Sequence, residues 1–512
     1  MSPIQQLFLG LGAKGESFWI RSIEPEGNST VELRGYGFSG ENVMSADRTD
    51  DGAMYALTGS ASGPPNYPAD KDGTHIFKFD KDGTILAKKS YFWGAGEQGG
   101  CTSMDSDGNM YIGNGTYGRM IKLNSSLVEQ ARLDTGLSEY SQNCDGFKFV
   151  GDYIHVYSPS RYNQDQGSKR YQVLNKSDLE PQNFGTSNYN TRGLTRFNNA
   201  GPYTIKNGKL YIVQVSNYVG NSAYHDLLSQ WDMTWNNASS PMDKDNDRDW
   251  HVRLSKADGT TGHTGTNNTN CLDVDDSGNV YTAGPCMQSG TGNSYRTPGN
   301  RNQFSKLNSS GQIQWMSSIE RGADGDGLHH WDQNYGDGGP LDININGNIL
   351  RAVCFGKNNT QTNKGGDKKD LSVVKMNAST GAYISSYSVC NETKNILMNG
   401  GGRDMPLRCL WTETAVYLTC QCQLSGSYGE RFWIMKLPID GGINGTYTLD
   451  GQTVKISDND LSAGDLSTSE KTWTSNGSND TDYRTGLHSQ SSTTFTQYQY
   501  HTASYDTDML DL

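Results

Sequence analysis

Residues 271–284 read CLDVDDSGNVYTAG, and this phrase decides the fold because it recurs along the chain. Each copy has a small residue, a short apolar stretch, a turn of Asp, Asn or Gly, and a strand centred on Tyr or Leu. The other copies are DRTDDGAMYALTG (47–59), CTSMDSDGNMYIGNG (101–115), CDGFKFVGDYIHVY (144–157), YTIKNGKLYIVQV (203–215), LDININGNILRAV (341–353) and CLWTETAVYLTC (409–420). Such self-similarity is the signature of an architecture built from one repeated unit.

A second phrase alternates with the first and consists of an apolar strand carrying Lys or Arg, a turn, and another strand. The clear copies are HIFKFDKDGTILAKKS (75–90), MIKLNSSLVEQARL (120–133), FSKLNSSGQIQWMSS (304–318), LSVVKMNASTGAYISS (371–386) and FWIMKLPIDGGINGTYTL (432–449). Weaker copies surround Val173 and Val252. Period-2 alternation bounded by DG, NG and SSG turns is the hairpin signal in both phrases. One copy of the first phrase and the following copy of the second make one unit. Each unit is therefore predicted to form two hairpins, or four antiparallel strands.

Four-stranded units repeated radially make a β-propeller, whose blades leave only short protected edges. We expect an all-β fold, a β-propeller of about seven four-stranded antiparallel blades over residues 17–451. The stretch FWIRSIEPEGNSTVELRG (18–35) echoes Phe432-Trp433-Ile434 and is expected to pair with strands from the far end of the chain. Such pairing would close the ring. Because residues 18–35 are an additional copy of the second phrase, eight blades are the alternative to seven. A β-helix is the alternative repeat fold, but its rungs are much shorter than the repeated units of this sequence.

Two extended arms flank the predicted propeller. Residues 1–16 contain an apolar run, Ile4 to Gly12, which is too short to span a bilayer and lacks the basic segment of a signal peptide. We interpret residues 1–16 as an N-terminal docking arm. Residues 452–512 are rich in Ser, Thr, Asp and Asn and contain very few aliphatic residues. This C-terminal extension is either a solvated tail or an arm ordered by a neighbouring subunit.

Composition excludes several classes of protein. Hydrophobic residues make up 33% of the 512 residues, charged residues 19% and aromatic residues 10%, with 61 glycines and a mean hydropathy of −0.71. These values argue against a membrane protein and a helical bundle, and they fit short strands joined by polar turns. The net charge of −13 and the lack of a basic stripe argue against nucleic-acid binding.

The best candidate for an ion site is the acidic run in DKDNDRD, residues 243–249. Alternating carboxylates on a loop can fold around a hard cation such as calcium. The expected ligands are Asp243, Asp245, Asp247 and Asp249. The sixth position is Arg248, where an EF-hand loop needs Gly, so a solvated acidic loop is the alternative. The Asp-Gly pairs at Asp82-Gly83 and Asp107-Gly108 are interpreted as hairpin turns.

Other reactive side chains are sparse. The first phrase places Cys101, Cys144, Cys271 and Cys409 at nearly the same position in four units, where small thiols are expected to pack. Because nine cysteines is an odd number, they cannot all pair within one chain. The cluster His329-His330-Trp331-Asp332 has catalytic residue types, but adjacent side chains in an extended chain point to opposite sides. Several aromatic residues could stack on sugars or pack at the rim: Trp231, Trp235, Trp250 and Tyr295.

No catalytic motif identifies an enzyme in this sequence. A sialidase box, a GxSxG elbow, an HExxH helix and a P-loop are all missing from it. We therefore expect a non-enzymatic protein with no catalytic residues and no cofactor, calcium apart. The alternative is a glycoside hydrolase or lyase, which would need paired carboxylates about 5–9.5 Å apart at one mouth of the propeller.

The N-terminal arm carries a resemblance to a known family. Residues 2–13, SPIQQLFLGLGA, resemble the start shared by many structural proteins of marine cyanophages, in which an IQQLxLGxGA-type arm precedes diverse bodies. The repeat phrases at residues 276–284 and 306–315 are similar to propeller bodies found in that group, and so is the Ser/Thr/Asp-rich tail. The first propeller strand follows the arm directly, without a separate anchor or trimerisation domain.

The resemblance implies a structural protein of a bacteriophage virion, assembled in the host cytoplasm. It implies a tail-associated fibre, nozzle or tip component that touches the host surface, with capsid decoration as the alternative. The implied partners are other virion proteins, bound through both arms in a multi-copy assembly, and a host surface glycan. No membrane insertion is expected. A cellular carbohydrate-binding propeller is a third class.

Overall fold

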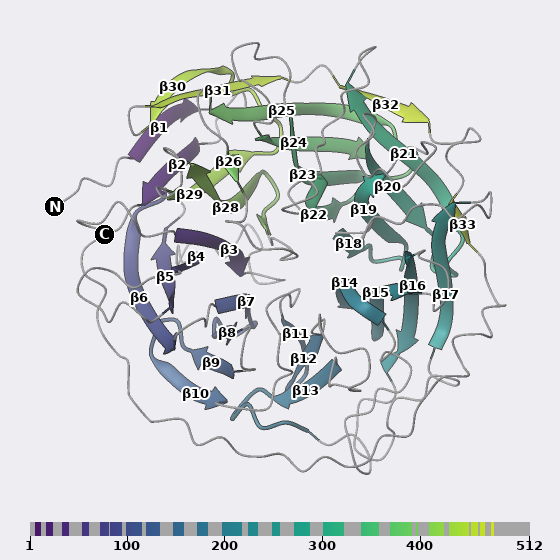
Figure 1. Ribbon diagram of the computed structural model, residues 1–512, viewed down its shortest axis with the longest axis horizontal. Helices are drawn as coiled ribbons and strands as arrows, with labels where there is room; N and C mark the ends of the chain where they lie inside the picture. The colour runs from purple at the N-terminus through teal and green to yellow at the C-terminus, as the bar shows by residue number, and fades with distance from the viewer. Residues whose placement is uncertain are drawn as a thin grey trace.

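The computed structural model consists of antiparallel β-sheets arranged around a ring (Figure 1). It describes residues 6–11, 17–23, 33–39, 54–60, 72–80, 82–94, 99–114, 119–133, 147–157, 171–182, 197–217, 224–233, 248–256, 271–286, 301–321, 339–357, 369–391, 396–397, 409–423, 430–449, 452–458, 461–465 and 473–475. Within these residues the strands are divided among seven sheets, which we number in chain order. The predicted all-β propeller is confirmed. Among the same residues, no helix is long and apolar enough to cross a membrane.

Three sheets contain only consecutive strands. Sheet 1 consists of β3 (Leu33–Ser39), β4 (Met54–Ser60), β5 (Asp72–Phe79) and β6 (Ile85–Gly94). Sheet 2 consists of β7 (Gly99–Met104), β8 (Met110–Asn114), β9 (Arg119–Leu123) and β10 (Glu129–Leu133). Sheet 3 has β11 (Phe147–Val150), β12 (Tyr153–Tyr157) and β13 (Tyr171–Asn175), and Pro181 forms a bridge with Leu174 at its outer edge.

Three further sheets add strands from the C-terminal part of the chain to four consecutive strands. Sheet 4 consists of β14 (Phe197–Lys206), β15 (Lys209–Asn217), β16 (Tyr224–Asp232), β17 (Arg248–Lys256) and β33 (Trp473–Ser475). Sheet 5 consists of β18 (Cys271–Val274), β19 (Val280–Cys286), β20 (Arg301–Leu307), β21 (Ile313–Arg321) and β32 (Leu461–Asp465). Sheet 6 consists of β22 (Gly339–Asn346), β23 (Ile349–Lys357), β24 (Lys369–Asn377), β25 (Tyr383–Asn391), β31 (Gln452–Asp458) and β30 (Gly445–Leu449).

Sheet 7 joins the two ends of the chain and closes the ring. It contains β26 (Ile396–Leu397), β27 (Leu410–Trp411), β28 (Ala415–Gln423), β29 (Glu430–Pro438), β2 (Ser17–Ile23) and β1 (Gln6–Leu11). β2 pairs with β29 from Trp19 opposite Lys436 to Ile23 opposite Phe432. The prediction that the stretch starting at Phe18 pairs with the far end of the chain is therefore confirmed.

The two sequence phrases form one sheet, and in four of the seven sheets a Tyr of the second strand lies opposite a Lys of the third. The pairs are Tyr55–Lys78, Tyr111–Lys122, Tyr281–Lys306 and Tyr417–Lys436. In the last three pairs the ammonium group lies over the aromatic ring, 5.3–5.8 Å from its centre. A cation over an aromatic face is attractive, and the lysine stem covers the ring. In these four sheets the Lys of the second phrase is thus the cross-strand partner of the Tyr in the first.

Aromatic residues of one sheet bind the turn of the next sheet around the ring. Trp250 of β17 donates its indole N–H to the carbonyl of Ser309 (2.9 Å), in the β20–β21 turn of sheet 5. Trp315 of β21 donates in the same way to Ala378 (3.0 Å) of sheet 6. The Tyr387 hydroxyl of β25 donates to the carbonyl of Pro438 (2.7 Å) of sheet 7. The same type of contact is therefore used at three successive boundaries between sheets.

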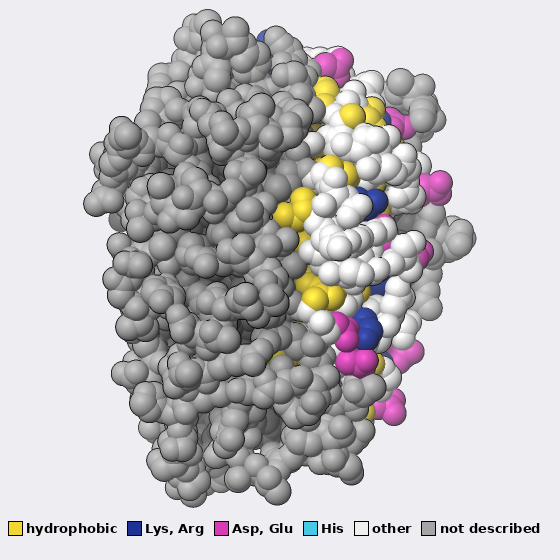
Figure 2. Space-filling view, turned by 90° about the vertical axis from the view of Figure 1, so that its right-hand side faces the viewer, with side chains coloured by type: hydrophobic (Ala, Val, Ile, Leu, Met, Phe, Trp, Pro, Cys, Tyr) yellow, Lys and Arg dark blue, Asp and Glu magenta, His cyan; other side chains and the backbone are white. Residues whose placement is uncertain are grey.

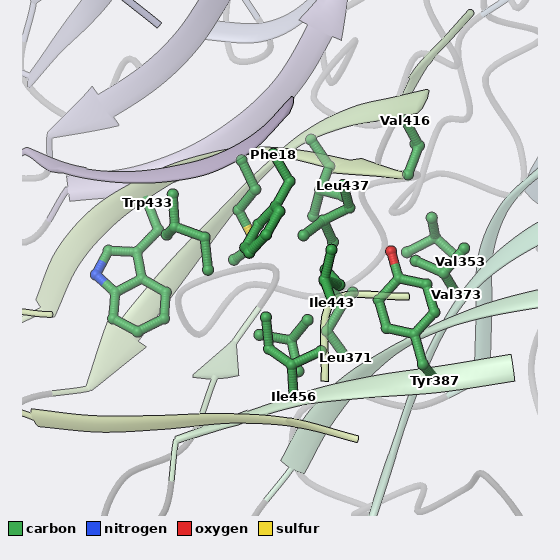
Figure 3. Packing of buried hydrophobic residues seen from close by; sticks show 14 of the residues in the cluster. Phe18, Val353, Leu371, Val373, Tyr387, Val416, Trp433, Leu437, Ile443 and Ile456 are labelled. Atoms are coloured by element: carbon green, nitrogen blue, oxygen red, sulfur yellow. The ribbon is translucent and has the colours of Figure 1, made fainter. Parts of the chain in front are cut away.

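Among the described residues, the largest hydrophobic cluster lies where β2 pairs with β29 and closes the ring, which we call the closing seam (Figure 3). Phe18 and Trp433, from β2 and β29, pack with Tyr387 of β25 and with Ile456 of β31. Each of these side chains is at most 3% exposed. Both ends of the chain therefore contribute to a core that also contains the central strands of sheet 6.

Sheets 4 to 7 have more than the four strands that the sequence predicted, and the strands added at the rim come from both ends of the chain; sheet 3 has three described strands. The strand β1, within the predicted docking arm 1–16, pairs with β2. The predicted boundary between residues 451 and 452 falls inside the β30–β31 hairpin, and Val454 and Ile456 of β31 are buried. The Val-x-Ile alternation in this short stretch gives β31 an apolar side that packs on sheet 6.

We predict that Phe18→Ala destabilises the whole ring, since Phe18 is 1% exposed and sits in the strand that joins the two ends. Removing a buried Phe side chain costs about 3–5 kcal/mol. Urea unfolding followed by tryptophan fluorescence measures the loss. Leu86→Ala is the matched control, because Leu86 is 50% exposed and its truncation should cost less than about 0.5 kcal/mol. Equal losses in the two variants would contradict the assigned role of β2.

Candidate functional site

The predicted calcium ligands are only partly within the described residues. Asp243, Asp245 and Asp247 lie outside them, whereas Asp249 lies in β17. The Asp249 carboxylate is 3.0 Å from the Lys209 ammonium, which also donates to Asp232 at 2.8 Å. The hydrogen bond to Asp232 raises the pKa of Lys209 above its usual value, and burial opposes this while Asp249 adds to it. In the described residues, Asp249 is therefore paired with the ammonium group of Lys209. Calcium binding by the four carboxylates stays a prediction.

Two of the four candidate sugar-stacking aromatic residues pack against other residues of the ring. Trp231 is 1% exposed and donates to the Ser229 hydroxyl (2.9 Å). Trp250 spans the boundary between sheets 4 and 5, as described above. Their contacts agree with rim packing. Trp235, Tyr295 and the cluster from His329 to Asp332 lie outside the described residues.

The cysteines that align in the repeat occupy packing positions where they are described. Cys271 is buried among Tyr281, Ala283 and Phe304, and Cys409 packs beside the cluster at the closing seam. Cys144 lies outside the described residues, and Cys101 is described only as part of β7. Within the described ranges, no group of three or more His, Cys, Asp or Glu side chains could hold a metal ion.

The best-defined polar site is the carboxylate that holds the first hairpin turn of sheet 2. One oxygen of Asp105 accepts the backbone N–H groups of Asp107 and Asn109, each at 2.9 Å. The other accepts from the Asn109 amide (3.0 Å) and the Tyr111 hydroxyl (2.9 Å). Gly108 has φ of +80°, a conformation that favours glycine. The interpretation of this Asp-Gly pair as a hairpin turn agrees with these contacts.

The same arrangement recurs in sheet 5, where the sequence phrase is nearly identical. Asp275 accepts the backbone N–H groups of Ser277 and Asn279, the Asn279 amide (2.8 Å) and the Tyr281 hydroxyl (3.2 Å). Each recurring position of the phrase D-x-x-G-N-x-Y therefore has a structural role. The Asp carboxylate accepts hydrogen bonds, the Gly adopts the positive φ of the turn, and the Asn and Tyr side chains donate hydrogen bonds. The central Tyr joins the turn to the middle of the sheet.

Electrostatics at the Asp105 turn favour the carboxylate. Burial raises the pKa of Asp105, but the hydrogen bonds from Asn109 and Tyr111 and the nearby Lys176 ammonium outweigh it, so the pKa lies below its usual value. Burial and the adjacent Asp105 charge raise the pKa of Tyr111, which stays a hydrogen-bond donor. An acceptor already filled by four donors is suited to holding a turn, and the group has no vacant position for a substrate.

Polar groups on the innermost strands link neighbouring sheets, and sequence reasoning missed them. Asp342 of β22 accepts from the Cys409 backbone N–H (2.8 Å) and the Trp411 indole (2.9 Å). Asp273 of β18 accepts from the Ile345 backbone N–H (2.8 Å) of the next sheet. Ser103 of β7 accepts likewise from Phe147 (2.7 Å). The available signal was a polar residue five positions before the turn glycine in three copies of the phrase.

Arg351 completes the link between sheets 6 and 7. Its guanidinium donates to the carbonyls of Thr412 (2.6 Å) and Glu413 (3.2 Å) and lies over the Trp411 ring. Burial lowers its pKa to about 10, although Asp273 and Glu413 oppose this. The side chain is 5% exposed and stays charged at neutral pH. Its role is to satisfy buried carbonyls at the boundary between the sheets.

His155 of β12 is a buried titratable group in the middle of sheet 3. It is 0% exposed, and its backbone carbonyl accepts the Tyr203 hydroxyl (2.9 Å) of sheet 4. Lys148 lies opposite it on β11, with its ammonium over the Tyr203 ring. Burial lowers the pKa of His155 from 6.5 to about 3, so the imidazole is neutral at neutral pH.

Comparisons with known proteins find no family for this chain and give solved structures of low similarity. No family model matches the chain, and no curated protein matches it. A protein of unknown function from Dyadobacter fermentans is 9% identical, with 81% of this chain and 99% of that chain covered and a TM-score of 0.37. Phage phi92 endosialidase is 9% identical, with coverages of 83% and 71% and a TM-score of 0.39. The plexin A4 extracellular region is 8% identical, with coverages of 80% and 51% and a TM-score of 0.41. At these identities nothing follows about function.

We predict that Asp105→Ala lowers the free energy of unfolding by about 2–3 kcal/mol, because Tyr111 and Asn109 lose a buried acceptor. Asp107→Ala is the matched control: its side chain is 71% exposed in the same turn, and its loss should cost less than about 0.5 kcal/mol. Chemical denaturation at neutral pH measures both. A loss in the Asp105 variant no larger than in the control would contradict the proposed role of this carboxylate.

We predict that His155 makes the fold less stable in mild acid. Its folded pKa of about 3 lies below the unfolded value of 6.5, so between these pH values the unfolded chain binds the proton and the native state does not. Stability is therefore full above pH 6.5 and falls, at up to about 1.4 kcal/mol per pH unit, as the pH decreases. Denaturation of the parent and of His155→Gln at several pH values between 6.5 and 4.5 measures the difference. Identical slopes would contradict a neutral buried imidazole.

Proposed function

We propose that this chain is a non-enzymatic structural protein of a bacteriophage virion, most simply a tail-associated component such as a fibre, nozzle or tip protein. The observation that carries the proposal is the arm SPIQQLFLGLGA at residues 2–13, which resembles the start of marine cyanophage structural proteins. A propeller body follows it, as in some members of that group. The proposed location is the virion, after assembly in the host cytoplasm.

The position of β1 is compatible with a docking arm. β1 is the edge strand of sheet 7. The strands β28, β29 and the closing strand β2 lie inside it. β1 pairs only with β2 among the described strands, and its register shifts between Phe8 and Leu11. A peripheral strand of this kind can present its outer edge to another protein, because an edge strand offers unpaired backbone groups.

The rim formed by the C-terminal strands is a second surface for virion partners. β30, β32 and β33 form the outermost strands of sheets 6, 5 and 4. Neighbouring copies and other virion proteins would meet these strands before the blades beneath them. In this proposal both arms contribute to a multi-copy assembly, and a host surface glycan is the ligand of the assembled particle.

Immunogold labelling of purified phage particles tests the proposal, with host adsorption scored in the presence of the same antibody. Label at the tail together with blocked adsorption is expected for a tail protein that meets the host. Label spread over the capsid with normal adsorption would make the chain a decoration protein. Absence of label from intact and opened particles would overturn the virion assignment.

A chain that begins at Ser17 provides the matched variant for this experiment. It lacks β1 and keeps β2, so the ring should fold with the same thermal midpoint within about 5 °C. The variant should be absent from particles when it replaces the parent during infection. Normal incorporation would show that residues 1–16 are not the anchor, while the gold pattern of the parent would still decide the location.

A further inference from the structure

The C-terminal strands follow the ring backwards, one sheet at a time. β31 pairs with β25 of sheet 6, β32 with β21 of sheet 5, and β33 with β17 of sheet 4. Each is antiparallel to the outer strand of its sheet, and Figure 1 shows them on the outer rim in this order. The chain thus adds one outer strand to each of three successive sheets and is heading towards sheet 3.

The spacing of these strands sets a pace along the chain. β31, β32 and β33 begin at residues 452, 461 and 473, so nine and then twelve residues advance the chain by one sheet. After β33 the sequence continues from residue 476 to residue 512, a further 37 residues. At the same pace this length is sufficient for three more sheets.

Three sheets in that direction have outer edges to which no C-terminal strand is added within the described residues. They are sheets 3, 2 and 1, whose outer strands are β13 with its short Pro181 bridge, β10 and β6. β6 is ten residues long, from Ile85 to Gly94. A long edge strand presents a row of unpaired backbone groups, which folded proteins usually cover.

The sequence of the last residues suits pairing at these edges. Thr496-Gln497-Tyr498-Gln499-Tyr500 alternates with the period of a strand and is rich in residues that favour strands. Residues 476–512 contain five aspartates and a single Arg or Lys, Arg484. The edge strand β6 carries Lys88 and Lys89 and no acidic residue. The charges of the two segments are therefore complementary.

We infer that residues 476–512 complete a belt around the propeller by pairing with the outer edges of sheets 3, 2 and 1. The occupant is the chain's own C-terminal segment, which arrives at these edges from β33. The belt would then run around the rim from sheet 6 to sheet 1, next to the seam where β2 closes the ring. The consequence is that this segment stabilises its own ring and is not a free tail.

Hydrogen–deuterium exchange with mass spectrometry on the full chain tests this inference. Peptides within residues 476–512 should exchange at least about tenfold more slowly than the same sequences as free peptides, at every protein concentration. Exchange at the free-peptide rate would overturn the inference. Protection that appears only as the protein concentration rises would assign the edges to a second copy of the chain and would overturn it as well.

A chain that ends at Ser475 locates the contact. Its loss of the last 37 residues should accelerate exchange in peptides covering β6 and β10 by at least about tenfold. Peptides covering β15 and β23, at the centres of sheets 4 and 6, are the internal control and should be unchanged. Unchanged exchange in β6 and β10 would overturn the inference. If exchange in β15 and β23 also changes, the truncated chain is not folded like the parent, and the full-chain measurement decides.

Discussion

Closure of the ring rests on five residues of β2 lying opposite five residues of β29. A shared sheet holds the first and last segments of the propeller together, and here the segments that meet are about 400 residues apart in the sequence. Long separations make such pairing costly in chain entropy, so the seam needs strong local contacts. The cluster around Phe18 and Trp433 supplies them, with Tyr387 of sheet 6 and Ile456 of β31 packed against the same core.

Closure also explains why the boundaries between sheets repeat one type of contact. Once the ring is closed, each sheet is held by two neighbours, and each boundary must satisfy its buried polar groups. Aromatic donors on the outer strands bind turn carbonyls of the next sheet, as Trp250 and Trp315 do. Side-chain acceptors on the inner strands, such as Asp273 and Asp342, bind backbone N–H groups of the next sheet. Each of these boundaries is thus stabilised by hydrogen bonds, from the innermost strands near the centre of the ring or from the outer strands near the rim.

The sequence was sufficient to predict the repeated hairpins because their signals are local. The Asp, Gly, Asn and Tyr of DSDGNMY all act within the β7–β8 hairpin, and Lys122 lies directly opposite Tyr111 in the next pair of strands, β8 and β9. The reverse path of β31, β32 and β33 could not be predicted in this way. LSAGD and WTS carry weak strand signals, and their partners are 140 or more residues away. The same limitation applies to Asp342, since its donors at Cys409 and Trp411 belong to another repeat.

The strands that flank the candidate site residues end on two different faces of the ring. The turns that join first to second and third to fourth strands lie on one face, where Lys206 of sheet 4 binds Asp276 of sheet 5 at 2.8 Å. In the view of Figure 2 acidic side chains stand out from the described part of the surface. The segment from β16 to β17, which contains Asp243, Asp245 and Asp247, joins strand ends on this turn face.

The segment that contains His329 and His330 joins β21 to β22, and the one with Tyr295 joins β19 to β20. Because neighbouring strands are antiparallel, these connections leave from the strand ends opposite the turns. The strands that flank the acidic run and those that flank the histidine cluster therefore meet their connecting segments at opposite faces of the ring. The outer rim, where both arms add strands, is the third surface, and it is the one that assembly through the arms would use.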